Sequence, residues 1–429
     1  MRPPQHGRRV IIVGTGIAGM TAAYLLNRAY DIQVFEAGDY IGGHTATVQV
    51  QEGERTIPVD TGFIVCNPAA YPGLMRLFDE IGAETQESCM SFSVADQVTG
   101  FEYGSRTLNN TFAQRRNAIS PAFWRFILDY FRFNREGAAA IDDPAYADHT
   151  LGDFLREKRY SRRFVRHFII PATSAIWSTP YRFAYEYPVQ ALFRFYRNHG
   201  MLGSKRTKWR SVVGGSHAYV PKLTASYRDR IHLRSGAVAV RRTESGMVVK
   251  LADGSECEAD HVVLATHSDQ ALALLADPTP AERAVLADIP YQANEVVLHT
   301  DARFMPRTRR AWESWNYLVY ASEKAGQDDH PVTMTYWMNL LQDLDALGAQ
   351  KNYFVTVNPQ RQPDPAKVIR RFVYHHPQYD FKAIRAQGRL PEINGADRVH
   401  FCGAWCRYGF HEDGLQSGVT VAANLGVTW

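Results

Sequence analysis

Three glycines near the N-terminus have the spacing of a phosphate-binding turn. Residues 8–27 read RRVIIVGTGIAGMTAAYLLN, and Gly14, Gly16 and Gly19 form the pattern GxGxxG between an apolar strand and a helical pattern. In that context the glycines allow a tight turn, close approach of a pyrophosphate and packing of helix on strand. A second apolar strand ends on Glu36, which can bind both hydroxyls of an adenosine ribose. The sequence therefore predicts an adenine dinucleotide site, and the glycines alone do not separate NAD from FAD.

The overall composition is that of a soluble globular protein. The chain has 429 residues, enough for two domains, and a net charge of only +4. We find no apolar run long enough to span a bilayer, and the glycines interrupt the N-terminal run, so we expect neither a membrane span nor a secretory leader. Five scattered cysteines without a CxxC pair favour reduced thiols in the cytoplasm and argue against a metal site.

Positive charge is concentrated in residues 151–210, here called the basic segment. It contains thirteen Lys and Arg against Asp153, Glu157 and Glu186. Such a surplus fits a solvated face, a nucleic acid or an anionic membrane. No nucleic-acid module is present, and Trp and Tyr residues interleave with the cations, as suits phospholipid headgroups. We expect no nucleic acid, and peripheral attachment to the inner face of the cytoplasmic membrane.

Other segments must bring further backbone to the dinucleotide. A run of predicted strands ends in VVLATH and delivers Thr266 to a sheet edge, and a C-terminal strand leads through Gly403 to a helix that should begin near Gly414. Between these pieces, residues 71–204 have a mainly helical pattern, and residues 277–392 mix strands with short helices. The predicted fold class is α/β, or α+β overall.

The helical part is rich in aromatic residues. Ser120 is a suitable N-cap for a helix with Pro121 in its first position. Two interpretations stay open: the aromatic residues form a helical core, or some line an apolar tunnel for a long hydrophobic substrate. The dense positions are Phe123, Trp124, Phe126, Tyr130, Phe131, Phe133, Phe183, Tyr185, Tyr187, Phe193, Phe195 and Tyr196.

The motifs GxGxxG, EAGDYIGGH, VLATH, FCGA and DGLQSG resemble the flavin amine-oxidase and phytoene-desaturase superfamily. TGFIVCNPAAYP, AIWSTP, VVGGSHAYV and YGFHEDGLQSG further resemble the flavoproteins fused to, or encoded beside, cyclopropane-fatty-acyl-phospholipid synthases. This resemblance covers the whole chain. It implies a Rossmann-like FAD-binding domain of residues 1–70, 205–276 and 393–429, interleaved with a substrate domain of residues 71–204 and 277–392 that combines a mixed sheet and helices.

The resemblance also implies non-covalent FAD and a set of contacts to it. The implied cofactor residues are Gly14, Gly16, Ile17, Ala18 and Gly19 at the pyrophosphate, Glu36 at the ribose, Gly43, His44 and Thr45 along the diphosphate and ribityl chain, Gly62 and Phe63 near the isoalloxazine, Val238 at adenine, and Thr266, Gly403, Gly414, Leu415 and Gln416. His44 stands where many relatives carry arginine, so it brings no fixed positive charge.

The implied activity is oxidation by hydride transfer to flavin N5, with molecular oxygen or another electron acceptor. A base is expected in WCRYGFHEDG, where Tyr408, His411 and Glu412 are the candidates, although helix capping is an alternative for His411, Glu412 and Asp413. The expected substrate is a fatty-acyl chain of phospholipid, methyl- or cyclopropane-modified, with a cyclopropane-synthase-like methyltransferase as a partner. Alternatives are an amine oxidase, a carotenoid or porphyrinogen oxidase, and a flavin-dependent isomerase without net redox turnover.

Overall fold

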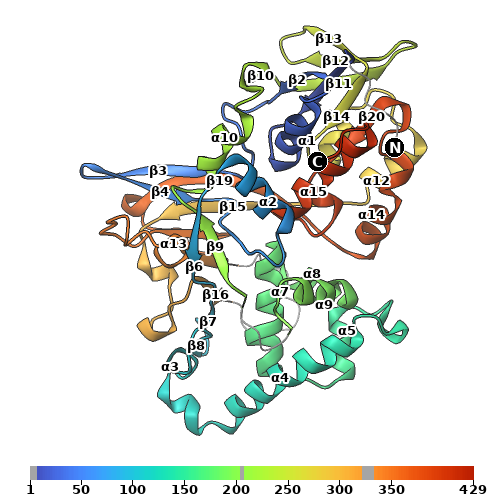
Figure 1. Cartoon of the computed structure of the whole chain (residues 1–429). Helices are drawn as coiled ribbons and strands as arrows, with labels where there is room; N and C mark the ends of the chain where they lie inside the picture. Colours follow the sequence, from blue (N-terminus) through green and yellow to red (C-terminus); the bar gives the residue numbers. More distant parts are fainter. Residues whose placement is uncertain (1–6, 203–206, 321–332) are drawn as a thin grey trace.

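The structure is a computed structural model. It describes residues 7–202, 207–320 and 333–429. The expected domain boundary at 204/205 lies outside the described residues, as do Lys205 and Arg206 of the basic segment. Helices and strands alternate along the chain, which confirms the predicted α/β class. Figure 1 shows one sheet with flanking helices at the top and a second sheet beside a group of helices below.

The upper sheet has five parallel strands drawn from the beginning, middle and end of the chain. Its order is β10-β2-β1-β14-β20. The central strand β1 is apolar because it is covered on both faces, and Ile11 and Ile12 are fully buried. The strands are β1 (Arg9–Val13), β2 (Asp31–Phe35), β10 (Ile231–His232), β14 (His261–Leu264) and β20 (Val399–Phe401).

Helices α1 (Ile17–Leu26) and α15 (His411–Asn424) pack side by side on this sheet. A Cβ at Gly418 would lie 2.5 Å from the carbonyl oxygen of Ala18, so the close approach requires glycine. The helix α15 begins three residues earlier than the expected start near Gly414. The reason is the carboxylate of Asp413, which accepts a hydrogen bond from the backbone N–H of Phe410 at 2.9 Å and caps the first turn.

An antiparallel sheet and three helices complete this part. The sheet contains β11 (Ala237–Arg242), β12 (Met247–Leu251) and β13 (Glu256–Ala259), and the helices are α11 (Ser268–Leu274), α12 (Pro280–Leu286) and α14 (Phe381–Ile393). The β11–β12 register shifts between Ala237 and Ala239, so Val238 is a bulge outside the ladder.

The lower sheet has seven strands in the order β19-β15-β18-β17-β16-β7-β8. The strands are β7 (Phe92–Asp96), β8 (Glu102–Gly104), β15 (Tyr291–His299), β16 (Trp315–Val319), β17 (Thr333–Trp337), β18 (Phe354–Val357) and β19 (Val368–Pro377). β15 and β18 confirm the strands expected there. Residues 71–204 are mainly helical, as expected, but they also contribute β7 and β8 to this sheet, where β7 pairs in parallel with β16, more than 200 residues away.

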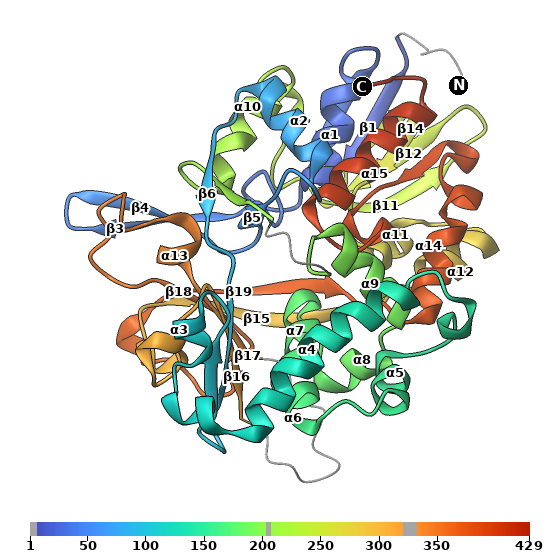
Figure 2. The same cartoon turned by 60° about the horizontal axis from the view of Figure 1, so that its bottom comes forward.

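Most of the helices of this part lie beside that sheet (Figure 2). They are α3 (Leu108–Thr111), α4 (Pro121–Ala140), α5 (Leu151–Glu157), α6 (Arg162–Phe164), α7 (Ile170–Trp177), α8 (Tyr181–Glu186) and α9 (Val189–Asn198). The predicted cap of α4 is confirmed, since the hydroxyl of Ser120 accepts a hydrogen bond from Phe123 N at 3.4 Å. Over the described ranges, no helix is long and apolar enough to cross a membrane.

Short elements connect the two parts. They are the hairpin of β3 (Thr47–Glu52) and β4 (Arg55–Asp60), the small sheet of β5 (Val65–Cys66), β6 (Thr85–Ser88) and β9 (Trp209–Val212), and the helices α2 (Pro72–Ile81), α10 (Val220–Thr224) and α13 (Met338–Gln342).

Some cations of the basic segment bond to neighbouring groups of the protein. Arg156 pairs with Asp153 at 2.6 Å, and Arg166 pairs with the buried Asp96 at 3.3 Å. The guanidinium of Arg210 donates to a backbone carbonyl of β6. Several of its cations therefore serve local contacts inside the fold.

Candidate functional site

The glycine turn after β1 is packed tightly at Gly14 and Gly19, but it has free space at Gly16, where a phosphate would lie. Gly14 has φ +103°, and a Cβ there would lie 2.7 Å from the carbonyl oxygen of Ala265. A Cβ at Gly19 would lie 2.1 Å from the carbonyl oxygen of Gly14, so α1 contacts the turn directly. At Gly16, in contrast, a Cβ would meet no heavy atom within 4 Å. The turn thus presents free backbone at the N-terminus of α1.

Glu36 lies at the end of β2 and is bonded to that turn. Its carboxylate accepts hydrogen bonds from Thr15 N at 2.9 Å, from Thr15 Oγ1 at 2.6 Å and from Gly38 N at 2.8 Å. A carboxylate offers about four lone-pair sites, so it retains capacity for one more donor such as a ribose hydroxyl.

Val238 lies close to the same place. Ser235 N donates to the carbonyl oxygen of Glu36 at 2.8 Å, and a Cβ at Gly236 would lie 3.0 Å from Ala37 Cβ. The bulge at Val238 leaves its backbone outside the ladder, with the residue 49% exposed. The structure therefore brings the expected ribose and adenine residues together.

The second glycine turn touches the first. A Cβ at Gly43 would lie 3.2 Å from the Cα of Gly16. His44 follows, and its buried Nε2 has no hydrogen-bond partner among the described residues. Burial, with smaller contributions from His267 and His375, lowers the pKa of His44 to about 4, so the imidazole is neutral.

Gly62 and Phe63 lie against this turn. A Cβ at Gly62 would lie 2.1 Å from the carbonyl oxygen of His44, and Phe63 N donates to the same oxygen at 2.8 Å. The ring of Phe63 stacks on that of His411, with centroids 3.8 Å apart and planes at 8°. The N-terminal and C-terminal segments therefore meet here.

His411 takes part in a buried polar cluster with Tyr219 and Thr45. The hydroxyl of Tyr219 lies 2.7 Å from His411 Nε2 and 2.8 Å from Thr45 Oγ1. Burial, and to a smaller extent His44, lowers the pKa of His411 to about 3. His411 is therefore neutral at ordinary pH, and its Nε2 can donate or accept a hydrogen bond without the ring carrying a charge.

Glu412 has a different role from the one expected. Its carboxylate accepts hydrogen bonds from Gly73 N at 2.9 Å and Leu74 N at 2.8 Å, at the N-terminus of α2, and from Gln416 Nε2 at 2.8 Å. These contacts make Glu412 a cap of α2, and the same carboxylate fixes Gln416. The expected capping alternative concerned the helix that begins near Gly414, whereas the helix that Glu412 caps is α2.

The start of α15 lies beside the start of α1. A Cβ at Gly414 would lie 2.8 Å from Ile17 Cγ2, and Leu415 is fully buried. Ahead of the helix, Gly403 N donates to Ser417 Oγ at 2.9 Å. The nearby indole of Trp405 donates to the carbonyl oxygen of Thr266 at 3.0 Å.

Tyr408 is separated from the His411 cluster. It lines a pocket of about 400 Å³ between α9, α14 and the loop of residues 403–410. The main lining residues are Tyr187, Arg194, Tyr379, Ile384, Arg407 and Tyr408. The three expected catalytic candidates thus lie in three different surroundings.

Two residues on β19 join the site without having been expected from the sequence. The hydroxyl of Tyr374 lies 2.9 Å from Thr61 Oγ1, and its ring is 4.8 Å from that of His44. The ring of His376 is 5.7 Å from that of His44, and burial lowers the pKa of His376 to about 3. The YHHP run was visible, but only the pairing of β19 in the lower sheet brings it to the second glycine turn.

Asp60 was also missed. It is fully buried at the end of β4 and accepts hydrogen bonds from Thr47 Oγ1 at 2.6 Å, Ser216 N at 2.8 Å and Gln342 Nε2 at 2.9 Å. Burial raises the pKa of Asp60 to about 7. Its contacts fix the strand that leads into Gly62. In the described part of the chain, no group of three or more His, Cys, Asp or Glu could hold a metal ion.

A parallel sheet with a glycine turn, an acid after its second strand and a C-terminal helix returning to that turn are the features of a dinucleotide-binding protein. The family model for flavin containing amine oxidoreductase matches residues 17–426, and the chain belongs to this family. The description of this family agrees with the flavin-dependent oxidoreductase class that the sequence predicted.

Individual relatives are more distant. Amine oxidase [flavin-containing] A of Sus scrofa is 35% identical over 282 residues, which cover 61% of this chain and 50% of that protein. The chain therefore spans about half the length of that curated relative. Cyclohexylamine oxidase from Brevibacterium oxydans has a TM-score of 0.67 at 17% identity over 98% and 99% of the two chains. The fatty acid isomerase of P. acnes has a TM-score of 0.68 at 15% identity over 97% and 98%.

Proposed function

We propose that the protein oxidises or desaturates a long hydrophobic substrate with an acidic head, most directly a fatty-acyl chain bearing a methyl branch or a cyclopropane ring. A methyltransferase that modifies acyl chains would supply such a substrate. The observation that supports this proposal is the pocket beside the loop of residues 403–410, because its lining combines aromatic rings with two arginines.

The pocket has the size of a small-molecule site, for which about 300–1,000 Å³ is usual. Tyr187, Tyr379 and Ile384 supply apolar surface. Next to it, the ring of Phe195 stacks on that of Phe410 with centroids 4.9 Å apart, directly before α15. An acyl chain could bury its methylene groups against such a surface at about 0.8 kcal/mol each.

The charge in the pocket favours an anion. Burial and the carboxyl of Asp413 raise the pKa of Tyr408, and the guanidinium groups of Arg194 and Arg407 oppose this rise. The carboxylate nearest to Arg194, that of Asp142, lies 3.6 Å away and is 73% exposed, and the guanidinium also donates to the carbonyl oxygen of Ile141 at 3.2 Å. Two guanidinium groups near one phenol suit a carboxylate or phosphate and disfavour a protonated amine.

The residues of the two glycine turns, together with Glu36 and Val238 (here called the cradle), fit FAD. The open backbone at Gly16 suits the pyrophosphate, Glu36 the ribose and the bulge at Val238 the adenine. The buried, unpartnered Nε2 of His44 needs a partner in the bound state. We infer that the other residues expected at the cofactor act with these, and that the FAD is held without a covalent bond.

FAD in this site would accept a hydride at N5. The N-terminus of α15, opened by His411 and Gly414, directs backbone N–H groups and a positive dipole end toward the same region as the start of α1. His411 is the candidate to hold or pass a proton through Nε2, with Tyr219 as its hydrogen-bond partner. Phe63 and Phe410 exclude water from that place.

The test is anaerobic mixing of the FAD-loaded protein with detergent-dispersed fatty acids and phospholipids that carry methyl-branched or cyclopropane chains. We expect these to bleach the flavin absorbance and to lose two hydrogens, detected by mass spectrometry. Failure of every acyl substrate to bleach the flavin, with rapid bleaching by amines, would overturn the proposal.

Amine oxidation is the second candidate, because the matched relatives are amine oxidases. The same anaerobic mixing experiment distinguishes amine oxidation from acyl-chain oxidation. An acyl product formed without bleaching and without oxygen uptake would instead indicate isomerisation, the activity for which the P. acnes neighbour is named.

A further inference from the structure

We propose that the outer face of α3, the turn of residues 115–119 and α4 is a docking surface for an anionic lipid bilayer. Large apolar side chains stand in water along one side of α4. Trp124 is 48% exposed, and Leu128 and Phe131 are each 64% exposed. Isolated exposed apolar residues are common, but a contiguous row of this kind marks an interaction surface.

The row follows the helical period. Trp124, Leu128, Phe131 and Arg135 are separated by four, three and four residues, which places them on one stripe of α4. The opposite side of the helix is also apolar, and it packs into the protein with Phe123, Phe126 and Phe133 as its main contacts. The outer stripe is therefore not part of the core.

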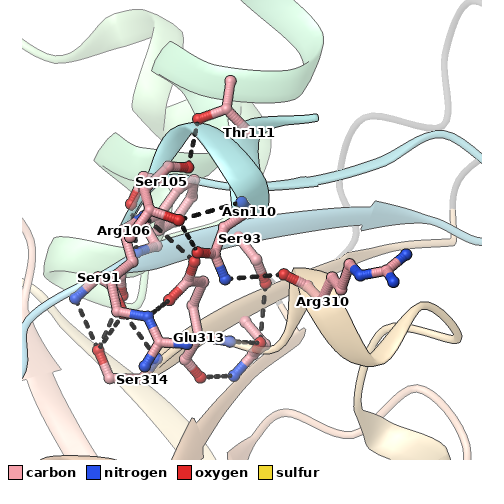
Figure 3. A network of polar contacts seen from close by, with 12 residues as sticks. Ser91, Ser93, Ser105, Arg106, Asn110, Thr111, Arg310, Glu313 and Ser314 are labelled. Atoms are coloured by element: carbon pink, nitrogen blue, oxygen red, sulfur yellow. Dashed lines mark hydrogen bonds and ion pairs between the residues drawn. The ribbon is translucent and has the colours of Figure 1, made fainter. Parts of the chain in front are cut away.

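Two more residues extend the stripe toward the N-terminus of the segment. Ile119 is 86% exposed and Leu108 is 78% exposed. The backbone that carries Leu108 is firmly held, as Figure 3 shows. Asn110 Nδ2 donates to the carbonyl oxygen of Arg310 at 2.8 Å, and the buried Glu313 accepts from Arg106 N at 3.1 Å. The exposed position of Leu108 is thus built into the fold.

The charge around the stripe is mainly positive. Residues 106–136 contain six arginines and two acids, Asp129 and Glu136. Asp129 is only 1% exposed and pairs with Arg125 and Arg132 at 3.2 and 3.3 Å, and Glu136 pairs with Arg132 at 3.1 Å. Three further arginines lie at the surface, at positions 115, 116 and 135. Arginines beside Trp, Phe and Leu match anionic headgroups above an acyl layer.

A bilayer fits this surface better than a second copy of the chain. In a symmetric dimer the same arginines would face one another, which is unfavourable. On a bilayer each meets phosphate, and Trp124 can enter the interface because its indole N–H is already bonded to the carbonyl oxygen of Ala118 at 2.8 Å. In Figures 1 and 2, α4 lies at the end of the molecule away from the parallel sheet.

The inner side of α4 links this surface to the proposed substrate pocket. The ring of Phe133 lies 5.2 Å from that of Phe193 on α9, and α9 also carries Arg194 of the pocket. The proposal nevertheless concerns attachment and does not depend on which substrate the pocket takes.

The experiment is co-sedimentation of the FAD-loaded protein with vesicles. The wild type should sediment with vesicles of phosphatidylglycerol and phosphatidylcholine in equal parts, and less with phosphatidylcholine alone or at high salt. The variant Trp124→Ser/Leu128→Ser/Phe131→Ser should bind at least about tenfold more weakly. The matched control is Leu347→Ser, which removes an exposed leucine (41%) from another part of the surface. Bound-flavin absorbance reports folding of every variant.

A second readout places the stripe in the lipid. Brominated acyl chains should quench part of the tryptophan fluorescence of the wild type, and Trp124→Phe should remove that part. Equal binding of the triple variant and the wild type would overturn the proposal, as would equal binding to neutral and anionic vesicles. So would self-association that the triple variant abolishes in the absence of lipid binding, since the surface would then be a protein interface. Oxidation of detergent-dispersed substrate, measured alongside, tests the proposed function separately.

Discussion

The proposed cofactor site and the proposed substrate pocket depend on different parts of the polypeptide. In the cradle the decisive groups are backbone: Gly14, Gly16 and Gly43 bring two turns into contact, and side chains are absent where the chain must come close. In the pocket the decisive groups are side chains on separate segments, such as Arg194 on α9 and Arg407 before α15. A backbone site tolerates few changes, whereas a side-chain site can be altered one charge at a time.

The two regions meet at α15. Its first turn is bonded to α2 through Glu412 and to the cradle through His411 and Gly414. The preceding loop carries Arg407 and Tyr408 into the pocket. A change on one side of this junction should therefore affect one function and spare the other.

The largest effect is expected from Gly16→Val. The fold has room for the new side chain, since a Cβ there meets no heavy atom within 4 Å, but the side chain would occupy the proposed pyrophosphate position. A clash of about 1–3 kcal/mol corresponds to roughly 10- to 100-fold weaker FAD binding. Flavin absorbance of the purified protein and titration with FAD measure it.

The control is Gly388→Ala, where a Cβ also meets no heavy atom within 4 Å but which lies in α14. Its FAD content should equal that of the wild type. Wild-type FAD affinity in Gly16→Val would show that the cofactor lies elsewhere, and the contrast between the two regions would then be lost.

The second prediction concerns Glu412. It tests whether the contact of α15 with α2 can be changed separately from its contact with the cradle. Glu412→Ala removes a charged acceptor from Gly73 N and Leu74 N, so it should lower the free energy of unfolding by about 2 kcal/mol. Glu412→Gln keeps the shape and should cost less. Urea unfolding of the FAD-loaded variants measures both. Unchanged stability together with a collapse in the rate of flavin reduction would return Glu412 to the catalytic candidates.

The strand, turn and helix around the first glycines, and the acid after the second strand, were well predicted because their information is local. GxGxxG, the strands around it and Glu36 lie within one short stretch, and spacing alone indicates their use. The cap at Asp413 could be predicted for the same reason. Glu412 could not, because whether it caps α15 or α2 depends on Gly73, 339 residues away.

The lower part of the molecule was less predictable. β7 is a strand because β16 pairs with it, and Tyr374 reaches Thr61 because β19 pairs along β15 at the edge of the lower sheet. The charge of the basic segment was evident, but its distribution was not, since Arg166 turns inward to Asp96. The exposed stripe of α4 looked in sequence like the rest of a helical core.

A third prediction tests the pocket alone. Arg407→Glu should raise the KM for acidic acyl substrates by about tenfold, because a charged hydrogen bond contributes roughly 1.5–3 kcal/mol and some is recovered from Arg194. FAD affinity should be unchanged. The matched control, Arg389→Glu, alters a surface arginine of α14 that pairs with Glu392 at 2.9 Å. Steady-state oxidation at several substrate concentrations measures both. An equal KM in wild type and Arg407→Glu would contradict the proposed head-group contact.

The smallest effect is a change in the pH dependence of stability at the junction. Burial lowers the pKa of His411 from 6.5 to about 3, so below pH 6.5 the unfolded chain takes up a proton that the folded protein does not. The stability that depends on this histidine is therefore complete above pH 6.5 and is lost as the pH falls toward 3.

The variant His411→Asn removes this loss, so its urea midpoint should fall less steeply with decreasing pH than that of the wild type. The raised pKa of Asp413 acts in the opposite direction but is present in both proteins. If the urea midpoints of the wild type and His411→Asn fall equally steeply with pH, water reaches His411. The first turn of α15 would then resemble the open pocket and not the buried cradle.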